Sequence, residues 1–515
     1  MSDNSVEIVQ QIRLQFEALL ARVQVSSGEP PSAYAMERRL VTDLLELGRL
    51  LLQCFFCSQH TVLEGVESVE VGGKQLPLHE QKRRSIRSVF GKITFTRGYY
   101  YEAKAKQGYH LLDARLNLPT GRTSDLLREW RSLLACYNAY RKTGKTLVSI
   151  LRQQHSVRAI EDDIERDCNL AETFCEQRPV PDPSSEDSVL VVQADGKGVP
   201  LVGQKQGKER VRLGKGEKSG RKKEAIATAV YTIEPCIRTP QQVTDSLFKS
   251  APSGQQNAPP DVQPVGEANT NKKRKRPSNK WLWATFKGKS AAIALAKKQA
   301  IGREGKHVSA RVALTDGAAP LQYQMLKQLP AYTLILDVIH AIEYLWKAAN
   351  GLYGEKSPKR EAWVKERVLL MLSGKTQQII DEFRKLATAP DCKKRASSAL
   401  LSTAGYYERN LPYMRYDMYL EKGWPIGTGV IEGACRHLIK DRCELSGMRW
   451  TIPGAEALLH LRSIAENDDW EEFEAYRQER RKREVYGNVL KIERCTTIER
   501  AAIEAKKVAA DCKAA

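Results

Sequence analysis

The stretch Val189-Leu190-Val191-Val192-Gln193-Ala194-Asp195-Gly196 is an apolar run that ends in one acidic residue followed by a glycine. Such a short run predicts a buried β-strand. A second run, residues 308–314, leads in the same way to Asp316 and Gly317. Open α/β sheets place their sites at strand ends, so both aspartates are candidates for one site. Taken singly, each Asp-Gly pair is more typical of a plain turn than of a site.

The elements around these two runs follow an ordered series. The strand candidates are residues 188–194, 225–233, 281–286, 308–315 and 332–337, and the helix candidates are residues 289–304 and 319–329. Three successive strands, then helix–strand–helix–strand and a late helix, predict an RNase H-like α/β catalytic core.

The residues before this core have a different pattern. Residues 1–60 predict two helices joined by a break at residues 28–31, and residues 85–101 predict a β-hairpin around Gly91-Lys92. Residues 123–175 predict helices, with Ser156 as an N-cap. Residues 143–160 have a helix-turn-helix layout that suits a DNA major groove, and an ordinary helical pair is equally consistent with them.

The fold class is therefore α/β, with a helical insertion in the core and a mainly helical N-terminal region that contains a hairpin. We expect the following regions: 1–178, the N-terminal helical and hairpin region; 187–340, the first part of the catalytic core, with a mobile basic loop at 236–280; 341–424, the helical insertion; 425–465, the last part of the core; and 466–515, a helical tail.

The composition favours a polyanionic partner. The 515 residues contain 82 Lys and Arg against 62 Asp and Glu, so the net charge is +20. That balance indicates nucleic acid or an anionic membrane surface. No stretch approaches the roughly 18 apolar residues of a spanning helix, so we expect no membrane partner. Residues 1–25 do not have the pattern of a secretory signal, and the 11 cysteines have no repeated spacing, which favours the cytoplasm.

A third acid, Glu432, lies in residues 429–434, at the predicted start of a helix. Asp195, Asp316 and Glu432 predict a site for Mg²⁺, with Mn²⁺ as a substitute, because hard cations prefer carboxylate oxygens. Without a cation, carboxylates about 4 Å apart repel by about 4 kcal/mol per pair at an effective dielectric constant of about 20. The alternative for Glu432 is a surface ion pair with Arg436, four residues further on.

Asp337 and His340 follow the last predicted strand with a D-x-x-H spacing. On spacing alone, two interpretations of His340 stay open. It contacts a scissile phosphate or orients an acid, or it is a structural histidine. Cys54, Cys57 and His60 lie in a run typical of a buried helix. A zinc site needs a second ligand pair, so we interpret them as structural.

Residues 205–223 contain nine basic residues, two acidic residues and several glycines. A Gly-rich basic loop directly after Asp195 predicts contact with a phosphate backbone, and a solvated hairpin is the alternative. Residues 272–276 are either a DNA clamp or a solubilising run. The candidate DNA-binding residues are Lys205, Lys208, Arg210, Arg212, Lys215, Lys218, Arg221, Lys222 and Lys223, with Arg436 and Lys440 on the face of Glu432.

Five stretches together resemble bacterial insertion-sequence transposases of the ISKra group and, more distantly, the Mutator-type DDE superfamily. They are residues 191–198 (VVQADGKG), 221–225 (RKKEA), 313–318 (ALTDGA), 336–346 (LDVIHAIEYLW) and 423–435 (GWPIGTGVIEGAC). The likeness extends over about residues 30–490, and residues 236–280 match weakly.

The resemblance implies a DDE transposase with Asp195, Asp316 and Glu432 as its metal-binding catalytic acids. Asp337 and His340 match the C/D-x-x-H motif of the Mutator type, which implies that both are catalytic residues as well, and the resemblance implies that residues 1–178 bind the DNA ends. The implied partners are the terminal inverted repeats, target DNA and further copies of the chain in a homodimer or higher oligomer, associated with the bacterial nucleoid. Two alternatives stay open: an RNase H-like nuclease that does not join strands, and a DNA-binding regulator derived from a transposase.

Overall fold

The structure is a computed structural model of the chain. It describes residues 3–24, 30–71, 74–103, 106–202, 222–248, 275–445 and 447–487. The chain divides into two compact units, the first made of residues 1–170 with 468–515 and the second of residues 171–467.

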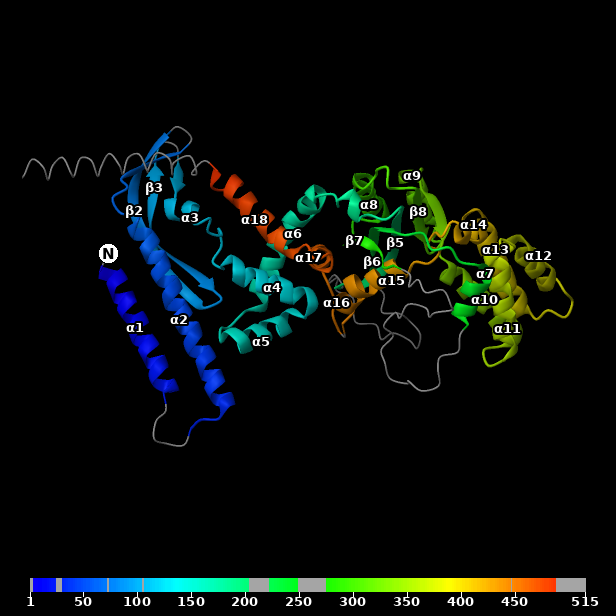
Figure 1. Cartoon of the computed structure of the whole chain (residues 1–515), viewed down its shortest axis with the longest axis horizontal. Helices are drawn as coiled ribbons and strands as arrows, with labels where there is room; N and C mark the ends of the chain where they lie inside the picture. The colour runs from blue at the N-terminus through cyan, green and yellow to red at the C-terminus, as the bar shows by residue number, and fades with distance from the viewer. Residues whose placement is uncertain are drawn as a thin grey trace, which may run out of the picture. The chain divides into compact units, whose positions relative to one another are not determined.

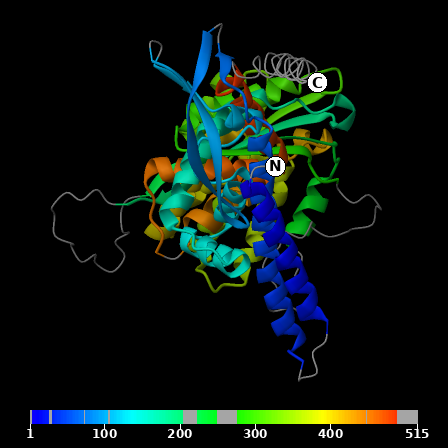
Figure 2. The ribbon, with the colours of Figure 1, turned by 90° about the vertical axis from the view of Figure 1, so that its left-hand side faces the viewer.

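The first unit begins with a helical hairpin. Helices α1 (Asp3–Val23) and α2 (Ala33–Thr61) lie side by side, and an ion pair between Arg22 and Asp43 joins them (Figures 1 and 2). The Ser32 hydroxyl caps α2 by accepting a hydrogen bond from the Ala35 N–H at 3.3 Å. The predicted pair of helices is confirmed. Residues 28 and 29 of the predicted break lie outside the described residues.

A four-stranded antiparallel sheet follows in the first unit. Its strands are β1 (Ser68–Val71), β2 (Lys74–Ser88), β3 (Gly91–Glu102) and β4 (Gln107–Tyr109), in chain order. The predicted hairpin is present, but its turn is Val89-Phe90 and not Gly91-Lys92, because Ser88 pairs with Gly91. Gly91 is therefore the first residue of β3, and its φ of +132° explains why a glycine stands there.

Helices complete the first unit. They are α3 (Leu111–Arg115), α4 (Asp125–Tyr137), α5 (Tyr140–Leu151), the start of α6 (Val157–Gln177) and α18 (Trp470–Glu484). The predicted cap at Ser156 is confirmed, because its hydroxyl accepts a hydrogen bond from the Ala159 N–H at 3.1 Å. A buried ion pair of 2.9 Å between Arg131 and Asp163 joins α4 to α6. Arg481 of α18 binds both carboxylate oxygens of Asp125, at 2.8 Å each.

The second unit is built on a five-stranded mixed sheet of order β7-β6-β5-β8-β9. The strands are β5 (Val189–Pro200), β6 (Lys222–Ile233), β7 (Ser278–Thr285), β8 (Ala310–Thr315) and β9 (Thr333–Leu336). β6 runs antiparallel to both β5 and β7, whereas β8 and β9 run parallel to β5. All five predicted strands are present, and their central residues are buried.

One strand end was predicted wrongly. β5 does not end at Asp195 but continues to Pro200, so Asp195-Gly196 is not a turn. The reason is the unequal length of the two neighbours of β5. β8 pairs with it only as far as Gln193, while β6 pairs with it along its whole length. Asp195 therefore lies within a strand, just past the point where the parallel neighbour stops.

The helices of the second unit follow the predicted order. α8 (Lys289–Gly302) precedes β8, and α9 (Ala319–Gln328) joins β8 to β9. A helical block then comes before Glu432: α10 (Val338–Tyr353), α11 (Lys359–Leu372), α12 (Thr376–Ala387), α13 (Lys394–Asn410), the short helix η2 (Leu411–Tyr413) and α14 (Tyr416–Glu421). The Tyr416 hydroxyl donates to the Leu336 carbonyl oxygen at 3.0 Å, which holds this block to β9.

The region 236–280 is not a loop throughout. Residues 240–247 form α7 (Pro240–Leu247), which begins with a capping box between Thr239 and Gln242. Asp245 forms an ion pair of 3.1 Å with Lys365 of α11. Pro240 favours the start of this helix, and the buried Val243 gives it a packing face. The prediction of a loop did not take these two residues into account. Residues 249–274, with most of the predicted basic run, lie outside the described residues.

Gly317 is required by the turn that follows β8. Its φ is +85°, and a Cβ added there would lie 2.5 Å from the Tyr406 hydroxyl oxygen and 2.8 Å from Leu336. We expect Gly317→Ala to lower the free energy of unfolding by roughly 2–3 kcal/mol, because a positive φ and a collision act together. Gly405→Ala is the matched control. It lies in α13 with open space around it, so it should be neutral or stabilising. Equal stability of the two variants in urea unfolding would contradict this account.

Candidate active site

The register of the parallel strands brings three aspartates level with one another. Gln193 of β5 pairs with Leu314 of β8, so two residues further on Asp195 is level with Asp316. Thr315 pairs with Leu336 of β9, so Asp316 is level with Asp337, and the Asp337 N–H continues the ladder to the Thr315 carbonyl oxygen at 2.9 Å. Side chains alternate along a strand, so these positions share one face of the sheet.

Asp195 and Asp316 are close enough to interact electrostatically. Burial raises the pKa of Asp195, and the Asp316 carboxylate raises it further. Hydrogen bonds from the Gly196 N–H and the Cys435 thiol, together with the charge of His340, oppose that rise. The Asp316 carboxylate accepts a hydrogen bond from the Ala318 N–H at 2.9 Å, which fixes the turn after β8. The two carboxylates thus repel one another in a half-buried position, which favours a cation between them.

Glu432 joins the cluster from the short helix α15 (Gly429–Ala434). Thr428, the residue at the N-cap position, is buried, and its hydroxyl donates to the Glu432 carboxylate at 2.9 Å. Burial raises the pKa of the Cys435 thiol, and the charges of Asp195 and Glu432 raise it further. Both acids therefore lie near this thiol. The third acid therefore lies near the first, although 237 residues separate them in the sequence.

Gln193 ties α15 to the sheet. It is fully buried in β5, two residues before Asp195 and on the same face. Its amide oxygen accepts a hydrogen bond from the Ile431 N–H at 3.0 Å, and its amide nitrogen donates to the Gly427 carbonyl oxygen at 3.3 Å and to the Tyr231 hydroxyl at 3.0 Å. One side chain thus fixes both the residue before Glu432 and the loop that leads to it.

Asp337, which is fully buried, and the partly exposed His340 form an ion pair at the start of α10. Asp337 is the N-cap residue, and one of its oxygens accepts from the His340 N–H at 3.0 Å and lies 2.6 Å from His340 Nδ1. The other accepts from the Thr428 N–H at 2.9 Å. The hydrogen bond to Asp337 raises the pKa of His340 to about 9, against the effect of burial. The imidazole is therefore a cation at neutral pH.

The structure thus brings all five predicted residues, Asp195, Asp316, Asp337, His340 and Glu432, into one cluster. Ligand atoms of Asp337, His340 and Glu432 lie within 4.8 Å of one another. Both oxygens of Asp337 already accept hydrogen bonds, and a cationic imidazole offers no lone pair to a metal. Among the described residues, no group with ligand atoms this close together contains Asp195 or Asp316, so Asp195, Asp316 and Glu432 are candidate cation ligands through their proximity and not as a preformed site.

The helical block contacts the turn that carries Asp316. Tyr406 of α13 donates from its hydroxyl to the Asp316 carbonyl oxygen at 3.0 Å. Its ring stacks on Tyr344 of α10, with centroids 3.7 Å apart and an interplanar angle of 7°. α13 therefore contacts the turn that carries Asp316 directly, and α10 supports this contact through the stacked ring of Tyr344.

Four of the candidate DNA-binding residues, Lys222, Lys223, Arg436 and Lys440, belong to the described part of the chain. Lys222 and Lys223 start β6, and Lys222 forms an ion pair of 2.6 Å with Glu444. Arg436 and Lys440 are exposed on a π-helical turn, Cys435–Lys440, which continues α15. Lys205, Lys208, Arg210, Arg212, Lys215, Lys218 and Arg221 lie outside the described residues.

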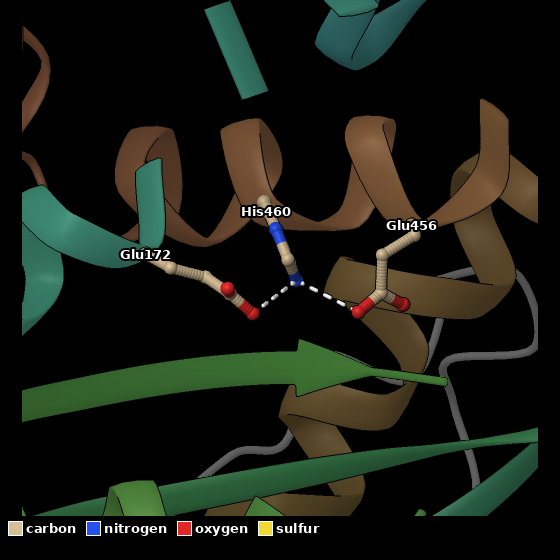
Figure 3. A group of neighbouring side chains, drawn as sticks. All are labelled: Glu172, Glu456 and His460. Atoms are coloured by element: carbon tan, nitrogen blue, oxygen red, sulfur yellow. Dashed lines mark ion pairs between the residues drawn. The ribbon is translucent and has the colours of Figure 1, made fainter. Parts of the chain in front are cut away.

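In a second group of side chains that could bind a metal, the carboxylates and the imidazole already interact with protein groups. Glu172, Glu456 and His460 point toward one another (Figure 3), with His460 Nε2 3.0 Å from Glu456 and 3.9 Å from Glu172. Glu456 also accepts hydrogen bonds from the Thr285 hydroxyl and the Phe286 N–H, and Glu172 forms an ion pair with Lys287. We interpret this group as a structural network of the second unit.

Three residues of the site were not predicted from the sequence. They are Gln193, Tyr406 and Cys435. The only sequence signal for Gln193 is a polar residue inside an otherwise apolar strand, on the same face as Asp195. Tyr406 and Cys435 carry no such signal, because their contacts depend on how the helical block and α15 pack. Cys54 and Cys57 lie in α2, where Cys57 is buried.

Part of the chain matches a known family model. Residues 36–229 match the model of an uncharacterised protein family, UPF0236. The match covers less than half of the chain and includes Asp195, but it ends before Asp316 and Glu432. No curated protein matches the chain. Among the described residues, no helix combines the length and the apolarity needed to cross a bilayer.

The His340–Asp337 pair predicts a pH-dependent stability. The pKa of His340 is about 9 in the folded protein, against a value near 6.5 in an unfolded chain. The stabilisation is therefore fully present below about pH 6.5 and is lost as the pH rises to about 9. We expect His340→Gln to be less stable than the wild type at pH 6 and the difference to narrow by pH 9.5. Urea unfolding at several pH values measures this.

His79→Gln is the matched control for that experiment, because His79 is exposed in the first unit. Its stability difference from the wild type should change little over the same pH range. A His340→Gln difference that stays constant from pH 6 to pH 9.5 would contradict the assignment of a cationic His340.

Proposed function

We propose that the protein is a DNA transposase of the DDE type, which cuts the terminal inverted repeats of an insertion sequence and joins the freed ends to target DNA. The observation that carries the proposal is the convergence of Asp195 from β5, Asp316 from the turn after β8 and Glu432 from α15. Three carboxylates from distant segments, with a basic chain around them, are what divalent-cation phosphodiester chemistry requires.

The topology of the second unit supports an RNase H-like core. Numbered by their order in the sequence, the strands lie across the sheet as third, second, first, fourth and fifth. The second is antiparallel to the first and the third, and the fourth and fifth are parallel to the first. This is the arrangement that the RNase H-like proposal requires, with the first acid on the central strand and the second after the fourth strand. The helical block between the fifth strand and Glu432 occupies the place of the insertion expected in such transposases.

Asp195, Asp316 and Glu432 would hold Mg²⁺ or Mn²⁺, since all three present carboxylates and the first two repel each other without a cation. A bound cation would supply activation of the attacking oxygen and charge neutralisation at the leaving oxygen. Gln193 and Asp337 fix the loop 427–431 and so position Glu432. We assign these two residues a positioning role rather than a catalytic one.

His340 would bind the phosphate undergoing reaction. It is a cation held in place by Asp337. Its charge lowers the pKa of Asp195, and the charge of Asp316 raises the pKa of His340. An anionic phosphate between the acids and the imidazole would gain a charge-assisted hydrogen bond. In the first reaction water attacks a phosphodiester at the transposon end and the 3′-oxygen leaves as a 3′-hydroxyl. In the second reaction that hydroxyl attacks a phosphodiester of target DNA at the same residues and displaces the 3′-oxygen of the target strand.

DNA would run past the exposed basic residues beside the cluster, of which Lys223, Arg436 and Lys440 are described. Basic side chains on the phosphate backbone give affinity without sequence specificity. The recognition of transposon ends would fall to the first unit, where α5 and the capped start of α6 have the helix-turn-helix layout.

The test of the proposal uses purified protein, labelled terminal inverted repeats and Mg²⁺ or Mn²⁺. We expect Asp195→Ala, Asp316→Ala and Glu432→Ala each to reduce cleavage and joining by at least about a hundredfold, because each removes charge stabilisation from the reacting groups. Glu421→Ala is the matched control, since Glu421 is an exposed acid at the end of α14. It should retain wild-type activity.

Each other outcome assigns the site differently. Cleavage without joining would indicate the RNase H-like nuclease. Specific binding of the repeats without cleavage by the wild type would indicate a DNA-binding regulator. If all three alanine variants cut and join like the wild type, the proposed active site is wrong.

A further inference from the structure

Helix α2 carries an exposed apolar stripe along the side that the first unit leaves open. Val41, Leu44, Leu51 and Phe55 follow the alternating spacing of three and four residues, with Gly48 at the one position between them. Their exposed fractions are 41%, 55%, 51% and 46%. Residues with this spacing lie in one row along a helix, which is the pattern of a coiled-coil seam.

Phe90 fills the gap that Gly48 leaves in the row. A Cβ added to Gly48 would lie 2.6 Å from the Phe90 ring, so this ring from the β2–β3 turn lies directly against the helix. Phe90 is itself 38% exposed. The row is therefore continuous from Val41 to Phe55, and we call these five side chains the α2 stripe.

The α2 stripe is not the face with which α2 packs into its own unit. That face carries Leu50, Phe56 and Cys57, which are buried. Phe56 stacks on Phe95 of β3, with centroids 4.4 Å apart and an interplanar angle of 8°. A surface helix of a monomeric domain needs one apolar face. α2 also carries the α2 stripe, on which Phe90 of the same unit covers Gly48 while Val41, Leu44, Leu51 and Phe55 stay between 41% and 55% exposed.

The area of the stripe matches what a stable interface needs. At the exposed fractions given above, its five side chains present roughly 500 Å² of apolar surface per copy, which is about the apolar part of the ~800 Å² that each partner buries in a standard interface. An apolar patch of that size on one helix is at the upper end of what monomeric proteins expose.

We propose that the α2 stripe is a homodimer interface in which α2 packs against α2 of a second copy of this chain. A single row with seam spacing is complementary to itself, so a two-fold arrangement buries the stripe of both copies. α1 lies beside α2 and exposes Phe16, Leu20 and Val23 at helical spacing, which would extend the contact. The inference rests on the first unit alone and does not depend on the proposed function.

The test measures the mass of the full-length protein by light scattering after gel filtration, free of nucleic acid and in 0.5 M NaCl. We expect the wild type to have twice the chain mass of 58.0 kDa at micromolar concentration. The double variant Leu44→Glu/Leu51→Glu should have the mass of one chain, because four buried carboxylates would face one another across the two-fold axis. Both leucines are exposed in the single chain, so the variant should fold, which circular dichroism checks.

Leu401→Glu is the matched control, because Leu401 is 49% exposed on α13, outside the stripe. It should remain dimeric. A monomeric wild type, or a dimer that the double variant leaves intact, would overturn the proposal. A third outcome would also overturn it. If the full-length chain is monomeric and a chain lacking residues 488–515 is dimeric, the stripe binds the chain's own C-terminal segment and not a second copy.

Discussion

The site depends on one constraint, the register in which β8 and β9 lie parallel to β5. That register places Asp195, Asp316 and Asp337 level with one another on one face, whatever their separation in sequence. The cost is repulsion between the partly buried carboxylates of Asp195 and Asp316, which burial increases. The neighbouring residues limit that cost. Cys435 and Gly196 donate to Asp195, Thr428 donates to Glu432, and the cationic His340 lies among the acids.

The surrounding elements have roles that follow from this arrangement. Gln193 and Asp337 reach from the sheet to the loop 427–431, so α15 is tied to two strands by side chains rather than by strand pairing. Tyr406 connects the helical block to the turn of Asp316 through a backbone carbonyl oxygen. A change in the packing of that block would therefore move the second acid directly. The proposed function and the fold of the second unit are thus linked through a few named hydrogen bonds.

The sequence predicted those parts of the structure that depend on local pattern. The apolar runs predicted the five strands, and the predicted cap at Ser156 follows from its own neighbours in the sequence. The prediction was wrong where the outcome depends on a partner far away. β5 passes through Asp195 because β6 is longer than β8, and α7 forms because Val243 packs inside the unit. Tyr406 and Cys435 were missed for the same reason, since nothing adjacent to them in sequence marks their contacts.

The central claim is that carboxylates from three distant segments form one divalent-cation site. Backbone cleavage by Fe²⁺ with ascorbate and peroxide tests it most directly, because a bound iron generates radicals that cut the chain beside its ligands. The account predicts cuts near residues 195, 316 and 432 and protection of all three by excess Mg²⁺. Cuts confined to other segments, such as those around Glu172 and His460, or cuts that Mg²⁺ does not suppress, would contradict it.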